Sequence, residues 1–197
     1  TLVPAPITPT PVASAPTGPY GELRIGVPTL YSQNIDALRA TLADKTETFG
    51  PMHEWMFRWG AKGVEPNVVQ KWEMAQDGLS WVYYIRKDVQ FHNGEDLKSD
   101  DVKYSLDAMA EEAHLGVQLK TAMKSVEIVD DYTVRVYTNG QRPFFPNLSC
   151  YLTPALGLLM PKDYIAAKGW GYYVQHPVGA GPFKFVRQVG ADLVEFE

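Results

Sequence analysis

Residues 77–106 read DGLSWVYYIRKDVQFHNGEDLKSDDVKYSL, and this stretch decides the fold. Asp77-Gly78 is a turn signal, because glycine accepts positive φ angles and aspartate can hydrogen-bond its own backbone. The run from Trp81 to Ile85 is aromatic and β-branched on both faces, which predicts a central strand covered on both sides. Asn93-Gly94 then marks a second turn, and a helix follows.

The predicted helix begins at Ser99. The Ser99 hydroxyl can accept a hydrogen bond from the free N–H groups of the first turn, where the helix dipole favours Asp100 and Asp101. Apolar residues then recur at intervals of four, three and four, which predicts one buried face. This stripe consists of Val102, Leu106, Met109 and Ala113.

The composition is that of a globular chain and excludes a nucleic-acid partner. The chain has 197 residues, of which 45% are hydrophobic and 21% charged, a balance that can bury a core of one or two domains. The formal net charge is −5, and no run of basic residues offers a phosphate-binding surface. No stretch approaches the roughly 20 apolar residues that span a bilayer.

Sequence motifs of catalysis and metal binding are missing. The chain contains no GxSxG, GxxxxGKS/T, GxGxxG or HExxH pattern, and its four histidines are scattered. The single cysteine, Cys150, excludes an intramolecular disulfide and is interpreted as a small buried hydrophobe. We therefore predict neither an enzyme nor a cofactor or metal site, although a hydrolase whose acid and base converge from distant positions stays open.

The order of these signals resembles the family 5 extracellular solute-binding proteins, the peptide, dipeptide and nickel receptors of ABC importers. That family typically shows a Trp-containing strand, an Asp-Gly turn, an aromatic strand ending in Arg, then Phe-His-Asn/Asp-Gly and a helix opening with Asp-Val. The corresponding positions here are Trp72, Asp77-Gly78, Tyr83 to Arg86, Phe91 to Gly94, and Asp101-Val102. Near the end of the chain, Pro177 to Pro182 resembles the family's Pro-Val-Gly-Thr-Gly-Pro signature, with Ala180 in place of Thr.

This resemblance implies an α/β fold, namely the first lobe of a type II periplasmic binding protein, with a mixed sheet and an inserted α+β subdomain. Residues 21–45 and 178–197 are expected to form the sheet subdomain, and residues 46–177 the insertion. Family members are much longer, so the second lobe is expected to be missing. Residues 1–20 are rich in Pro and Thr and are predicted to be a disordered tether.

The implied function is capture of a small ligand between two lobes and its delivery to an ABC permease in the membrane. An oligopeptide is the first expectation, an oligosaccharide the alternative within the family, and a non-transport interaction or sensor module a third reading. The full-length protein is expected to be a monomer in the periplasm or on the extracellular face of the cytoplasmic membrane. The tether resembles the spacer that follows the lipidated cysteine of bacterial lipoproteins in this family. We therefore also expect a lipid anchor. The alternative is a tail without an anchoring role.

Two loops are candidate walls of the ligand cleft. Tyr31 and Asn34 follow a strand predicted over Glu22–Val27, and in the resembled family this loop faces the ligand. Tyr151 and Thr153 lie in the second wall, which carries no cation. An ordinary polar turn is the alternative interpretation of the first loop.

Other patterns complete the prediction. From Ile35 to Trp59 the periodicity is helical, and its Met and aromatic stripe is interpreted as core, with Trp55 and Trp59 able to reach a cleft instead. With Trp170, these tryptophans are the candidate sugar-stacking residues. A hairpin turning at Asp130-Asp131, a short helix starting near Pro143, a helix from Pro161 to Gly169, and strands over 184–189 and 192–196 are also predicted.

Overall fold

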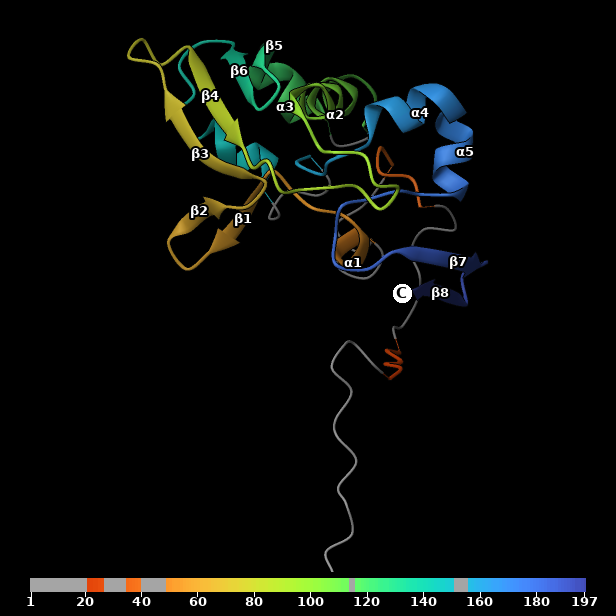
Figure 1. The fold of residues 1–197 in the computed structure, drawn as a ribbon. Coiled ribbons are helices and arrows are strands. Elements are labelled where there is room, and N and C mark those ends of the chain that lie inside the picture. Colours follow the sequence, from red (N-terminus) through yellow and green to blue (C-terminus); the bar gives the residue numbers. More distant parts are fainter. Residues whose placement is uncertain (1–20, 27–34, 40–48, 114–115, 151–155) are drawn as a thin grey trace, which may run out of the picture.

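A four-stranded antiparallel sheet with the strand order β3-β4-β6-β5 organises the protein (Figure 1). The computed structural model describes residues 21–26, 35–39, 49–113, 116–150 and 156–197. The strands of this sheet are β3 (Val69–Met74), β4 (Ser80–Ile85), β5 (Met123–Asp130) and β6 (Thr133–Thr138).

Two hairpins and several helices complete the described part of the fold, and in Figure 1 the helices α2 to α5 lie to one side of the sheet. The hairpins pair β1 (Phe57–Gly60) with β2 (Gly63–Pro66), and β7 (Phe185–Val189) with β8 (Leu193–Phe196). The helices are α1 (Gly50–Met52), α2 (Ser99–Glu112), α3 (Val117–Ala122), the 3₁₀-helix η2 (Phe145–Ser149), α4 (Lys162–Lys168) and α5 (Trp170–Gln175). The α/β class predicted from the sequence is confirmed. The named strands pair antiparallel, and a parallel bridge joins Phe57 to Cys150.

The sheet is covered on one face. Strand β4 lies between β3 and β6, so its predicted central position is confirmed. Tyr83 and Ile85 are buried, and α2 packs against β5 and β6. Val82 and Tyr84, which point to the other face, are only half-buried. The prediction that both faces are covered was therefore wrong, because a bulky β-branched or aromatic side chain fits a half-exposed sheet face as well as a buried one.

Both turns of the organising stretch are confirmed with the predicted chemistry. Gly78 has a φ of 72°, and the Leu79 N–H donates to Asp77 Oδ1 at 2.9 Å. The second turn repeats the arrangement, with the Glu95 N–H donating to Asn93 Oδ1 at 3.2 Å. These local bonds stabilise backbone angles that glycine adopts without a Cβ clash.

The N-terminus of α2 corrects the predicted cap. Asp101, rather than Ser99, accepts the cap hydrogen bond, since its Oδ2 lies 3.0 Å from the Lys98 N–H. The Ser99 hydroxyl instead donates to the Asp130 carbonyl at 2.5 Å, because the start of the helix packs against the β5–β6 turn. The buried apolar stripe is confirmed, with Val102, Leu106 and Met109 fully buried.

Asp101 also hydrogen-bonds the first residue of α4, and substitution of Asp101 should therefore destabilise the protein. Its Oδ1 accepts the Lys162 N–H at 2.9 Å, so one carboxylate joins two helix starts. Burial raises the pKa of Asp101 to about 6, so the carboxylate is charged at pH 7.5. We expect Asp101→Ala to lower the free energy of unfolding at pH 7.5 by about 2–4 kcal/mol, because two N–H groups lose their acceptor.

Urea denaturation followed by circular dichroism measures this loss, and Asp100→Ala is the matched control. Asp100 is the preceding residue but is half-exposed, and its carboxylate contacts Lys162 Nζ at 3.1 Å on the surface. Surface ion pairs contribute about 0–1 kcal/mol, so the control should lose much less. Equal losses in the two variants would contradict the role of Asp101 in joining the helices.

Two predicted elements are absent from the described residues. Residues 22–26 pair with no described strand, and Leu23 and Ile25 are 83% and 74% exposed. The alternation of apolar residues in this segment therefore predicted a strand, but none of the described strands forms backbone hydrogen bonds with it. The predicted helix over Ile35–Trp59 reduces, among its described residues, to α1 and a short turn at 37–39. The helix gives way to strand β1, because the Met56 N–H donates to the Gly157 carbonyl at 2.8 Å rather than to a carbonyl four residues back.

The remaining predicted elements are confirmed. Strands β5 and β6 turn at Asp130-Asp131, η2 follows Pro143, and β7 and β8 form at the predicted positions. Helix α4 ends at Gly169, whose φ is 84°. Within the described residues, no helix is both long and apolar enough to cross a membrane.

Candidate functional site

All four residues predicted to line a ligand cleft, Tyr31, Asn34, Tyr151 and Thr153, lie outside the described residues. The structure describes their neighbours. Ile35 and Ala37, which follow the first loop, are 1% exposed, and Cys150 and Leu156, which flank the second, are 0% and 2% exposed. Both loops therefore have at least one end in the core, and their part in a site stays a prediction.

The segment Glu54–Phe57 lies beside both ends of the second loop. Phe57 forms a parallel bridge with Cys150, just before residues 151–155, and Trp55 forms an antiparallel bridge with Leu158, just after them. The Leu159 N–H also donates to the Glu54 carbonyl at 3.0 Å. A site that includes the second predicted wall would therefore adjoin this segment.

A hollow of about 410 Å³ opens at this segment, and we call it the tryptophan pocket. This volume falls within the range of small-molecule sites, roughly 300–1,000 Å³. Residues before and within β1, the turn after β2 and Pro182 line it. Its polar and aromatic lining comprises His53, Glu54, Trp55, Phe57, Arg58, Trp59 and Asn67.

Asn67 fixes the polar side of the tryptophan pocket. Its side-chain amide is buried and donates to Glu54 Oε2 at 2.7 Å and to the Trp55 carbonyl at 2.8 Å. The carboxylate of the half-buried Glu54 is therefore held in one orientation. A charge-assisted bond of this kind is stronger than one between neutral groups, so the acceptor is positioned before any ligand arrives.

His53 is a buried, neutral residue in the wall of the pocket. The side chain is 2% exposed, and burial lowers its pKa to about 3, so the imidazole is neutral near pH 7. Its Nδ1 lies 3.3 Å from the Leu159 carbonyl oxygen, which requires the proton on Nδ1. Nε2 is then an acceptor, and it is buried without a hydrogen-bond partner among the described residues. Because this atom has almost no accessible surface, it can accept a hydrogen bond from a ligand only if the wall of the pocket shifts.

The three tryptophans that are candidates for stacking on a sugar do not all lie in one place in the structure. Trp55 is 4% exposed and belongs to the core, whereas Trp59, a member of the stripe interpreted as core, is 43% exposed at the rim of the same pocket. Trp170 lies elsewhere, donating to Asp36 Oδ2 at 3.4 Å and packing against Tyr173 with ring centroids 5.2 Å apart. The structure therefore brings Trp55 and Trp59 together and leaves Trp170 apart.

The pocket combines acceptors, a cation and a planar apolar surface. The half-buried Glu54 accepts hydrogen bonds, the exposed Arg58 carries a positive charge, and Trp59 offers a ring face. This set suits a ligand that has both hydrogen-bond donors and an apolar or flat part. Among the described residues, no group of three or more His, Cys, Asp or Glu side chains could hold a metal ion.

Sequence reasoning missed the polar residues of this pocket. The sequence indicates only a turn around Asn67, and the histidines share no metal-ligand spacing that would single out His53. The available signal is the pair His53-Glu54, two polar residues inside an otherwise apolar Met and aromatic stripe. An interruption of this kind indicates that the stripe meets a polar feature, but it does not identify Asn67 as the partner.

Comparisons with known proteins relate the chain to one family. The sequence model of the bacterial extracellular solute-binding proteins, family 5 Middle, matches residues 63–197. Heme-binding protein A of Haemophilus influenzae is 28% identical over 150 residues, and Di/tripeptide-binding protein 4 of Pseudomonas aeruginosa is 29% identical over 151 residues. Each of these alignments covers 66% of this chain and 27–28% of the relative.

A solved structure shows the same fold. The solute-binding protein MoaA of A. tumefaciens R10, in complex with mannopinic acid, superposes with a TM-score of 0.72 at 26% identity. The match covers 82% of this chain and 34% of that protein. The chain thus spans about a quarter to a third of the length of these relatives.

Proposed function

The chain belongs to the bacterial extracellular solute-binding proteins of family 5, and from this membership we propose that it is part of the substrate-binding component of an ABC importer. The family match over residues 63–197 is the observation that carries the proposal. The family and the relatives named above are binding proteins rather than enzymes.

An oligopeptide is the ligand that we propose. The di/tripeptide-binding relative supports this class, and so does the chemistry of the tryptophan pocket. A peptide carries N–H donors for Glu54, and its side chains could pack against Trp59. Tyr31, Asn34, Tyr151 and Thr153 remain in the proposal as further ligand contacts from the two flanking loops.

The proposed mechanism is capture between two lobes. Closure of the lobes would remove the ligand from water and create the surface that the permease recognises. In this scheme residues 21–45 and 178–197 belong to one subdomain of the first lobe and residues 46–177 to the other. The whole protein would act as a monomer in the periplasm or at the extracellular face of the membrane, with residues 1–20 as a tether to a lipid anchor.

An oligosaccharide is the second candidate ligand, and the exposure of Trp59 favours it. An aromatic ring that is 43% exposed at the rim of a pocket can stack on a sugar ring as well as on a side chain. The MoaA structure was solved with mannopinic acid, so ligands differ among proteins of this fold.

Native mass spectrometry of the protein recovered from the envelope of its source cell tests the proposal. We expect a small adduct whose fragmentation yields amino acids, because a closed two-lobe protein retains its ligand. An adduct that fragments into sugars would replace the peptide with the oligosaccharide. A stable protein complex without any small adduct would overturn the transport proposal in favour of an interaction module.

A substitution tests the tryptophan pocket separately from the family function. With a random tripeptide library as the probe, we expect Trp59→Ala to weaken retention about tenfold, the equivalent of about 1.4 kcal/mol. Tyr172→Ala is the matched control, since Tyr172 is 42% exposed in α5 and does not line the pocket. Unchanged retention in Trp59→Ala would exclude the pocket and leave peptide capture intact.

A further inference from the structure

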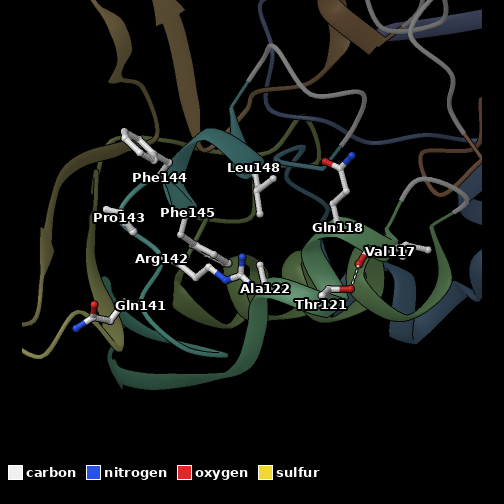
Figure 2. A pocket seen from close by; sticks show the side chains of 10 residues that line it. All are labelled: Val117, Gln118, Thr121, Ala122, Gln141, Arg142, Pro143, Phe144, Phe145 and Leu148. Atoms are coloured by element: carbon white, nitrogen blue, oxygen red, sulfur yellow. Dashed lines mark hydrogen bonds between the residues drawn. The ribbon is translucent and has the colours of Figure 1, made fainter.

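A second hollow, of about 520 Å³, lies between α3 and the segment 141–148. We call it the Arg142 hollow (Figure 2). Among the described residues, none lines both this hollow and the tryptophan pocket. It is therefore a separate feature, and the function proposed above does not use it.

The walls of the Arg142 hollow are largely apolar. Phe145 is 1% exposed and Leu148 half-buried, and they form the inner wall. Phe144 and Val117 are 75% and 71% exposed, and Figure 2 shows them at opposite ends of the hollow. Single exposed apolar residues need no explanation, but here two of them border one concave apolar surface, which is typical of a binding site.

Among the described residues that line the hollow, Arg142 is the only ionisable one, and Figure 2 shows its guanidinium reaching toward Ala122 of α3. Its Nε donates to the Asn139 carbonyl at 3.3 Å. Among the described residues, no carboxylate lies within ion-pair distance of this guanidinium. The hollow thus presents a positive charge that lacks an acidic counterpart in the described part of the chain.

The backbone of Arg142 is anchored on two sides. Its carbonyl accepts the indole N–H of Trp81 at 3.0 Å, and its N–H donates to the Gly78 carbonyl at 3.4 Å. Trp81 belongs to β4, so the central strand and the Asp77-Gly78 turn both position the base of this side chain. A guanidinium on a fixed backbone loses less freedom when it binds a planar anion.

We propose that the Arg142 hollow binds a small monocarboxylate with an apolar body. The carboxylate pairs with the Arg142 guanidinium, whose two parallel N–H groups match the two oxygens. The apolar body lies against Phe144, Phe145 and Leu148. A single cation with apolar walls favours one carboxylate over a phosphate, since a phosphate dianion requires more donors than this lining offers.

Calorimetric titration of the full chain with 4-phenylbutanoate tests this proposal, because that probe joins one carboxylate to an aromatic body. We expect binding that weakens at least about tenfold in Arg142→Gln and several-fold in Phe144→Ala. The neutral probe 4-phenylbutanamide should bind about tenfold more weakly to the unmodified chain. Arg187→Gln is the matched control, because Arg187 is an exposed arginine of β7, paired with Glu195 at 2.6 Å.

Backbone amide chemical shifts locate the probe. We expect titration shifts at residues 117–122 and 142–148, with circular dichroism showing that each variant stays folded. No binding at about 5 mM probe, equal affinity in Arg142→Gln, or shifts confined to other regions would each overturn the proposal. None of these outcomes depends on the tryptophan pocket or on peptide capture.

Discussion

Gly179→Ala is expected to destabilise the protein strongly, because the added methyl group would collide with the backbone at the end of α1. A Cβ at position 179 would lie 2.0 Å from the Met52 carbonyl oxygen and 3.0 Å from His53 Nδ1. The Met52 oxygen also accepts the Gly181 N–H at 2.8 Å, so it cannot move away without breaking that bond. We expect a loss of about 3 kcal/mol or more in the free energy of unfolding.

Chemical denaturation of Gly179→Ala and Gly171→Ala provides a matched comparison. Gly171 lies inside α5, and a Cβ there would meet no atom within 4 Å apart from the backbone of its own helix and its chain neighbours. Alanine is the better helix former by about 0.5–1 kcal/mol, so the control should be neutral or more stable. A Gly179→Ala protein as stable as the control would show that the turn and α1 are not in close contact.

The second large effect is a loss of stability in acid through His53. Its folded pKa of about 3 lies below the ordinary value of 6.5, because burial disfavours the charged imidazolium. Below pH 6.5 the unfolded chain binds a proton that the folded chain does not, so stability is complete above pH 6.5 and falls as the pH drops toward 3. Between pH 6.5 and 4.5 this difference amounts to about 2–3 kcal/mol.

His53→Leu separates this effect from the titration of carboxylates. Leucine has a similar size and cannot be protonated, so the variant should lose less stability than the unmodified protein between pH 6.5 and 4.5. The exposed His176 offers a control, and His176→Gln should retain the full pH dependence. His92 adds to the acid sensitivity, since partial burial lowers its pKa while its Nε2 contacts the Gly181 carbonyl at 2.9 Å. If His53→Leu and the unmodified protein lose stability equally, His53 is not a buried neutral base.

These two predictions concern the same junction. The Gly-Ala-Gly turn packs on α1 through Met52, and the His92 N–H donates to the Gly179 carbonyl at 2.8 Å. The turn thereby joins the segment leading into β7 to the wall of the tryptophan pocket. In the proposed two-lobe scheme, a loosened turn would change both stability and the shape of the ligand site.

Local chemistry determined much of the fold. The turns at Asp77-Gly78 and Asn93-Gly94, the apolar stripe of α2 and the hairpin at Asp130-Asp131 follow from interactions within a few residues of one another. Such signals can be read from the sequence because their partners are nearby along the chain. The order of these signals also identified the family.

Only the tertiary structure decided which polar groups meet across long distances in the sequence. Asp101 replaced Ser99 as the cap because Ser99 bonds to Asp130, and residues near Trp55 became extended because their backbone bonds go to residues 157–159. The tryptophan pocket unites Asn67 and Pro182 with residues 50–59, and the Arg142 hollow depends on α3 facing residues 141–148. The physical reason is the same in each case. A hydrogen bond or a hollow between distant segments forms only after the core has packed these segments together. It therefore produces no periodic residue pattern in either segment that could be recognised in the sequence.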